Sequence, residues 1–152
     1  LDPDKRYVLF SSDFARPEKN ASLAIEACSY LENVELLELK GYSREEMVTL
    51  MNAVDVGLLT SVREGSPMFV KEMIACRRPV VSTDVGDVSQ LISDIPGCYI
   101  VPDDPKLIAQ KVKECFDHPV IDVPVDKLNR IDNKLIAKRL VEVYHKVARN
   151  RK

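Results

Sequence analysis

Short apolar runs alternate with stretches of helical periodicity, and this alternation constrains the fold more than any other feature of the chain. The apolar runs are predicted strands, and they cover residues 7–12, 34–39, 55–60, 79–82 and 98–101. Predicted helices cover residues 21–31, 43–51, the segment after Pro67, the segment from Gly86 through Ile92, and residues 103–116 and 133–149. Such alternation builds βαβ units, in which the strands are parallel and helices cover both faces of the sheet. The sequence therefore predicts an α/β, Rossmann-like fold with about five strands.

The C-terminal part of the chain departs from this alternation. Residues 118–130 (HPVIDVPVDKLNR) contain two prolines and predict a connection that runs over the surface. The helix that follows carries its apolar residues on one face: Ile136, Leu140, Val143, Tyr144 and Val147. With 152 residues and no internal repeat or low-complexity tract, the chain is expected to form a single domain, residues 1–152.

Charge and cysteine spacing exclude several functional classes. The formal net charge of −2 argues against a domain that binds nucleic acid through a strongly basic surface. The four cysteines, Cys28, Cys76, Cys98 and Cys115, form no C-x-x-C pair, so no metal site is expected. They are predicted to be buried free thiols of a cytoplasmic protein.

The terminal segment KLIAKRLVEVYHKVARNRK is rich in lysine and arginine. Basic residues suit the C-terminal end of a helix and keep it soluble. The alternative interpretation is weak peripheral contact with an anionic membrane at its inner, cytoplasmic face.

The loops after the strands are the expected ligand sites, because ligands of open parallel sheets bind at the carboxyl ends of the strands. Arg16 and Lys19 follow the first strand and could bind a phosphate together with helix amides. The alternative is a solvated loop in which Asp13 and Glu18 pair with these cations. Neither a G-x-G-x-x-G nor a P-loop lysine motif is present, which disfavours ordinary dinucleotide-binding and P-loop proteins.

The loop after the third strand is the strongest candidate site. Glu64 and Glu72 are separated by seven residues, and Pro67 between them is predicted to be the first residue of a helix. Backbone amides from Met68 onward would then be free to bind a ligand. Glu72 could accept hydrogen bonds from the hydroxyls of a ribose or hexose. The alternative is that Glu64 is an exposed loop acid and Glu72 a surface charge paired with a neighbouring lysine or arginine.

This stretch resembles the signature of the group 1 (family 4) glycosyltransferases, in their C-terminal domain that binds the nucleotide sugar. The matching features are the E-x7-E spacing of Glu64 and Glu72, the Ala75-Cys76 pair, Pro79-Val80-Val81 and the glycine turn at Gly86. The resemblance extends outward to Val8–Asn20 and Asp55–Ser61, and so covers nearly the whole chain.

The resemblance implies one half of a GT-B fold and a reaction that transfers a hexosyl group, with retention of configuration, from a UDP- or GDP-sugar. The acceptor would be a glycan or lipid-linked sugar of surface polysaccharide biosynthesis, and neither metal nor cofactor would be needed. By the same resemblance, Glu64 would be catalytic and would contact the donor sugar, and Glu72 would bind the ribose. Arg16, Lys19 and the amides of Met68 and Phe69 would bind the diphosphate, and the nucleobase would lie near Gly41 and Tyr42.

A GT-B enzyme needs a second domain that binds the acceptor, and the resemblance covers only the donor half. An N-terminal acceptor-binding domain or a partner subunit is therefore expected outside these residues, and the isolated domain is expected to be inactive. Two other functions stay open: a non-catalytic module that binds a nucleotide sugar or regulates another protein, and the domain of a GT-B epimerase.

Overall fold

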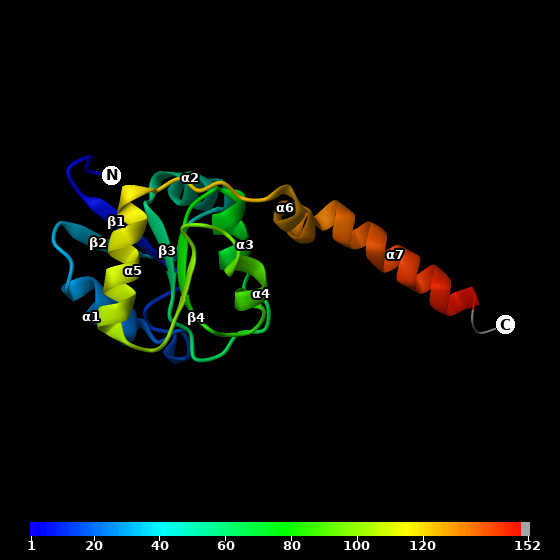
Figure 1. Cartoon of the computed structure of the whole chain (residues 1–152), viewed down its shortest axis with the longest axis horizontal. Coiled ribbons are helices and arrows are strands. Elements are labelled where there is room, and N and C mark those ends of the chain that lie inside the picture. The colour runs from blue at the N-terminus through cyan, green and yellow to red at the C-terminus, as the bar shows by residue number, and fades with distance from the viewer. Residues whose placement is uncertain (150–152) are drawn as a thin grey trace. The chain divides into compact units, whose positions relative to one another are not determined.

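The computed structural model describes residues 1–149, and the chain divides into two compact units, Leu1–Asp122 and Val123–Lys152. The first unit holds a parallel sheet of five strands (Figure 1). The strands are β1 (Arg6–Phe10), β2 (Val34–Glu38), β3 (Val56–Leu59), β4 (Val80–Thr83) and β5 (Tyr99–Val101). Their order is β2-β1-β3-β4-β5, and every neighbouring pair is parallel. The predicted α/β, Rossmann-like fold is confirmed.

Helices cover both faces of this sheet. The first face carries α1 (Ala21–Ser29) and α5 (Pro105–Asp117), which pack against each other. The second face carries α2 (Arg44–Ala53), α3 (Met68–Ala75) and α4 (Val88–Ile92) (Figure 1). Right-handed crossovers explain why α1 lies on one face and α2, α3 and α4 on the other. The chain runs in one direction along the sheet from β1 to β2, and in the opposite direction from β2 to β3 and on to β5. The sheet therefore has its topological switch point between β1 and β3.

Alternating side chains of the strands form a core on each face of the sheet. Val8, Phe10 and Leu58 belong to the cluster that packs against α1 and α5. On the opposite face, Gly57 lets α3 approach β3 closely. A Cβ atom at Gly57 would lie 2.9 Å from Cγ of Met73, so this position has room for hydrogen only.

Local signals account for most of the helix ends. Ser43 caps α2 and forms a capping box with Glu46, as the spacing of these residues predicts. The Asp104 side chain accepts hydrogen bonds from the first amides of α5. Most other predicted boundaries lie within one or two residues of the observed ones.

The prediction that residues 118–130 only form a surface connection is wrong. Helix α6 (Val125–Ile131) overlaps the second half of the predicted connection. It forms there because Pro124 occupies its N-cap, where a proline starts a helix instead of ending one. The part before α6 is also partly buried. Ile121 is 5% exposed, and its backbone amide donates to the Arg77 carbonyl at 2.9 Å.

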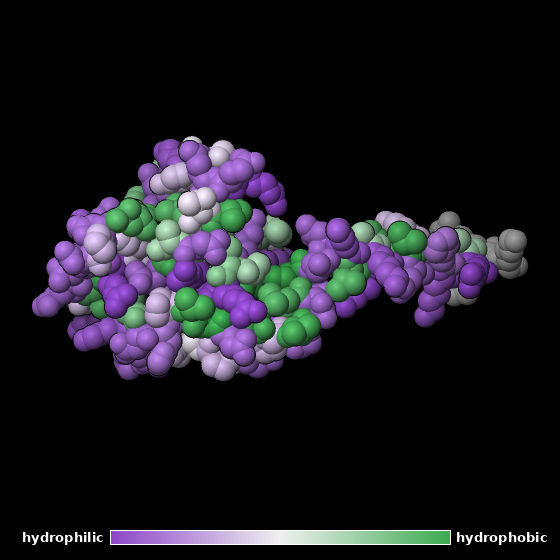
Figure 2. Space-filling model, turned by 90° about the horizontal axis from the view of Figure 1, so that it is seen from above, coloured by the Kyte–Doolittle hydropathy of each residue, from purple (hydrophilic) through white to green (hydrophobic). Residues whose placement is uncertain are grey.

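The second unit consists of α6 and α7 (Asn133–Arg149). Helix α7 begins and ends where the sequence predicts, but none of its side chains is buried. The five apolar residues expected on one face are 42% to 64% exposed. Figure 2 shows apolar atoms in green among hydrophilic ones along α7. None of the helices in residues 1–149 combines the length and the apolarity that a bilayer crossing requires.

All four cysteines are free thiols, but only Cys98 and Cys115 are buried. Cys28 and Cys76 are half-buried, so the prediction of four buried thiols is wrong for these two. Burial raises the pKa of Cys98 to about 11 and that of Cys115 to about 12. These two thiols therefore behave as small apolar side chains near neutral pH.

Candidate functional site

The loops after β1 and β3 meet at the switch point of the sheet. The Val62 amide donates to the Glu18 carbonyl at 3.0 Å, which ties one loop to the other. The hydroxyl of Thr60, buried at the end of β3, donates to the carbonyls of Lys19 and Asn20, each at 3.0 Å. Two segments about forty residues apart in sequence are thus fixed against each other at the sheet edge where ligands bind.

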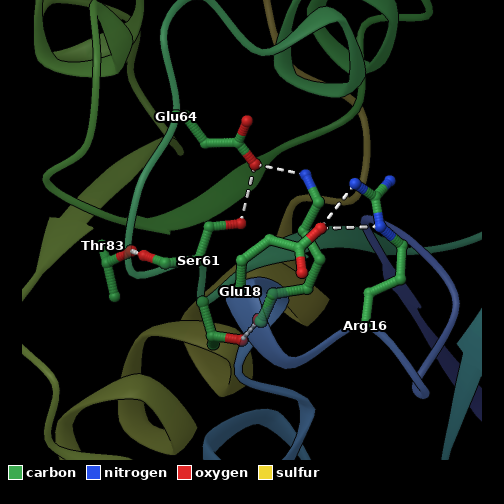
Figure 3. A network of polar contacts seen from close by, with 7 residues as sticks. Arg16, Glu18, Ser61, Glu64 and Thr83 are labelled. Carbon is green, nitrogen blue, oxygen red and sulfur yellow. Dashed lines mark hydrogen bonds and ion pairs between the residues drawn. The ribbon is translucent and has the colours of Figure 1, made fainter.

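An ion pair between Lys19 and Glu64 lies at the centre of this junction (Figure 3). The two side chains are only 13% and 15% exposed. The Ser61 hydroxyl donates to the same Glu64 oxygen at 2.8 Å, and Thr83 donates to the Ser61 carbonyl at 3.0 Å. Lys19 was predicted to bind a phosphate, and the family resemblance implied that Glu64 contacts the donor sugar. The structure shows that these two side chains contact each other. Their charges offset each other, and the Glu64 carboxylate is held in one orientation.

The Arg16 side chain does not contact Glu64 but pairs with Glu18. Arg16 precedes a short 3-10 helix (Pro17–Lys19), and its Nε donates to Glu18 Oε1 at 2.8 Å (Figure 3). The Arg16 side chain is 56% exposed. The pKa of Glu18 is lowered, first by its own backbone amide and then by Arg16. The structure thus shows, for this cation, the pairing that the solvated-loop interpretation predicted.

The loop after β4 packs tightly on the loop that carries Glu64. Gly86 has a positive φ of 58°, and a Cβ atom there would lie 2.2 Å from the Gly65 carbonyl oxygen. The Asp87 amide donates to that same oxygen at 3.1 Å. Ser66 donates to Asp87 and accepts from Lys71 Nζ at 2.6 Å. No local sequence pattern indicates this Ser66–Asp87–Lys71 cluster, because Ser66 and Asp87 lie 21 residues apart along the chain.

The N-terminus of α3 faces the same sheet edge. Pro67 is the N-cap and Met68 the first helical residue, one position later than predicted. The first amides of a helix have no acceptor within it, so those of Met68 and Phe69 can bind a ligand. The Phe69 side chain is buried in the core, whereas the Met68 side chain is 53% exposed. These two residues therefore offer backbone groups on an anchored helix end.

Glu72 lines a pocket between α2 and α3. The pocket has a volume of about 270 Å³ and is lined by Arg44, Met47, Val48, Met51, Glu72, Ala75 and Cys76. The half-buried carboxylate of Glu72 makes no hydrogen bond or ion pair within residues 1–149. Its expected alternative partners are engaged elsewhere, since Lys71 contacts Ser66 and Arg77 faces Asp122. The carboxylate is therefore free to accept hydrogen bonds from a ligand.

Gly41 and Tyr42 lie between β2 and the start of α2. Gly41 has a φ of 78°, in the region that favours glycine, and it turns the chain toward the α2 N-cap. The Tyr42 side chain is 42% exposed. Its ring is thus accessible to a ligand. Among the described residues, no group of three or more histidines, cysteines or acids is arranged to hold a metal ion.

Residues 26–118, more than half of the chain, match the sequence model of the family described as glycosyl transferases group 1. The chain belongs to the group 1 glycosyltransferases. This confirms the family that the E-x7-E stretch predicts. No curated protein matches the sequence.

Several solved structures of greater length share the fold of this chain. An α,α-trehalose 6-phosphate synthase from Burkholderia multivorans is 13% identical with a TM-score of 0.76, over 97% of this chain and 43% of that one. AviGT4, a glycosyltransferase of avilamycin A biosynthesis, is 18% identical with a TM-score of 0.63, over 96% of this chain and 53% of its own. HepE from Anabaena, solved with UDP and glucose, is 18% identical with a TM-score of 0.60, over 97% of this chain and 48% of its own. The group 1 chain thus spans about half the length of these structures.

Proposed function

We propose that this group 1 glycosyltransferase chain is the donor-binding half of a retaining enzyme that transfers a hexosyl group from a UDP- or GDP-sugar. The observation that carries the proposal is Glu72, a half-buried carboxylate with no partner among the described residues, which lines a pocket between α2 and the C-terminal half of α3. A carboxylate accepts two hydrogen bonds at once, which suits the paired 2′- and 3′-hydroxyls of a ribose. HepE, of the same fold, was solved with UDP and glucose, which supports this assignment.

The diphosphate would lie at the α3 N-terminus. Free amides of Met68 and Phe69 and the positive end of the helix dipole favour an anion there. Lys19 and Arg16 would add positive charge at the leaving group, where charge develops during the transfer. Since both cations are paired with glutamates, binding of a diphosphate would have to compete with Glu18 and Glu64.

Glu64 would contact the hydroxyls of the donor sugar. Lys19 and Ser61 already fix its carboxylate, so little conformational freedom would be lost when sugar binds. The nucleobase would lie near Gly41 and Tyr42, at the start of α2. An acceptor-binding domain or partner subunit would complete the active site, and the acceptor would be a glycan or lipid-linked sugar of surface polysaccharide biosynthesis.

The proposal is tested by calorimetric titration of the 152-residue chain with UDP, GDP and their hexose conjugates. Glu72→Gln should weaken binding by about tenfold to a hundredfold, because hydrogen bonds to a charged group contribute roughly 1.5–3 kcal/mol. Glu26→Gln is the matched control, since Glu26 is exposed on α1, which covers the other face of the sheet. No binding by any of these nucleotides, or equal affinity for the Glu72→Gln variant, would refute the proposed donor site.

A further inference from the structure

We propose that α7 binds the surface of an anionic lipid bilayer, with its apolar face among the acyl chains and its cations at the phosphate headgroups. This inference does not depend on the proposed donor site. It starts from an unequal distribution of charge along the chain. Residues 1–122 hold thirteen lysines and arginines against twenty-one acids, whereas residues 123–152 hold nine against three. The first unit is thus acidic and the second unit strongly basic.

The apolar residues of α7 occupy one continuous face. At 3.6 residues per turn, an arc of about 160° contains apolar side chains only, apart from Asn133 at the start of the helix. The six large side chains of this arc are Ile136, Leu140, Val141, Val143, Tyr144 and Val147. Each of them is 42% to 64% exposed. The arc is wide enough to lie in the interface of a bilayer along the whole length of the helix.

Cations cover the polar face of α7 and both of its borders. Five lysines and arginines lie on this face with a single acid, Glu142. Lys134 lies at one border of the apolar arc and Arg139 at the other. Long cationic side chains at such borders can lay their stems over acyl chains while their charges reach the headgroups. None of the five cations forms an ion pair within residues 1–149, so all are available to phosphate groups.

The helix dipole does not explain most of these cations. The dipole favours positive charge in the last turn, which holds Lys146 and Arg149. Lys134 lies in the first turn, where the dipole disfavours a cation, and Lys138 and Arg139 lie near the middle of α7. A negatively charged partner accounts for all five positions, because it attracts cations along the whole helix.

A bilayer fits this arrangement better than a second copy of α7. Two copies packed through their apolar faces would bring Lys134 and Arg139 of both helices to the rim of one interface, where like charges repel. An anionic bilayer instead presents negative charge on both sides of an embedded helix and acyl chains beneath it. Helix α7 would lie along the bilayer surface, since no helix in residues 1–149 is suited to crossing it.

Vesicle sedimentation with the 152-residue chain tests the inference. The chain should bind vesicles of phosphatidylglycerol and phosphatidylcholine in equal parts at least about tenfold more tightly than vesicles of phosphatidylcholine alone. Lys134→Gln combined with Arg139→Gln should weaken binding to the anionic vesicles roughly thirtyfold, because each cation near such a surface contributes about fivefold. Equal affinity for both kinds of vesicle, or no binding to either, would overturn the inference.

The matched control removes two charges from the first unit. Lys106→Gln combined with Lys113→Gln takes two exposed lysines from α5 and should change the affinity by less than about threefold. An equal loss of binding in the two double variants would show that only total charge matters, and this result would also overturn the assignment to α7.

A further variant tests whether the apolar face enters the bilayer. Leu140→Gln keeps every charge and a good helix former at an exposed position, so circular dichroism should show an unchanged fold. It should weaken vesicle binding at least about tenfold, because the leucine no longer enters the acyl region. Unchanged binding would overturn the insertion of this face. A chain that self-associates without lipid, and that Leu140→Gln makes monomeric in sedimentation velocity, would show a protein interface on α7 and overturn the inference.

Discussion

The contact between Gly86 and Gly65 is a strong structural constraint on the loop that carries Glu64, and Gly86→Ala tests it. An alanine at Gly86 must keep a φ of 58°, which disfavours a residue with a Cβ atom by about 1–2 kcal/mol. Its Cβ would also lie 2.2 Å from the Gly65 oxygen and 3.0 Å from the Glu64 oxygen. Both are backbone atoms, so no side-chain rotation relieves the clash, and overpacking of this kind costs about 1–3 kcal/mol. We therefore expect Gly86→Ala to lower the free energy of unfolding by about 2–5 kcal/mol.

Gly41→Ala is the matched control for this experiment. Gly41 has a similar positive φ of 78°, but a Cβ atom there would have no neighbour within 4 Å. The control variant should lose only the backbone contribution, about 1–2 kcal/mol. Urea unfolding followed by circular dichroism gives both values, provided that the slope against urea concentration stays constant. If Gly86→Ala destabilises the protein no more than Gly41→Ala does, the two loops are not packed as described.

Two further predictions concern charged residues. Lys19→Met should lower the free energy of unfolding by about 3 kcal/mol, because it leaves the largely buried Glu64 carboxylate without its cation. The double variant with Glu64→Gln should recover part of that loss, and strict additivity in the urea unfolding of the four proteins would contradict the coupling. The Ser43 amide is the chief cause that lowers the pKa of Glu46 from its ordinary value of 4.5. The stabilising effect of the Glu46 carboxylate is therefore complete above about pH 4.5. It is lost as the pH falls through the lower pKa that Glu46 has in the folded protein. Glu46→Gln should therefore flatten the stability profile below pH 4.5, and an unchanged acid profile would exclude this contribution.

Sequence patterns predicted those features that depend on residues close together in the chain. The strand and helix alternation follows from the periodicity of apolar residues, and the capping box of α2 follows from the spacing of Ser43 and Glu46. The same local reasoning gave the wrong result at residues 118–130. A proline can end one helix or begin the next, and local pattern does not distinguish the two roles at Pro124.

The candidate site was predictable as a set of loops but not as a set of contacts. Lys19 and Glu64 are 45 residues apart, and they meet because β1 and β3 are neighbours in the sheet. Sheet topology brings the two loops together, whereas the loop conformations decide which side chains pair. The sequence also did not indicate that the Glu72 carboxylate lacks a partner among the described residues. This depends on the Lys71 side chain contacting Ser66 instead of Glu72.

The central claim is that a nucleotide binds at the N-terminal half of α3, and backbone amide chemical shifts test it most directly. In a titration of the isotope-labelled chain with UDP and GDP, the account predicts shifts at Met68, Phe69 and Glu72. Amides in the C-terminal halves of α1 and α5, which cover the opposite face of the sheet away from the Arg16–Lys19 loop, should remain unchanged. Shifts confined to those two helix ends, or no shift with either nucleotide at millimolar concentration, would contradict the account.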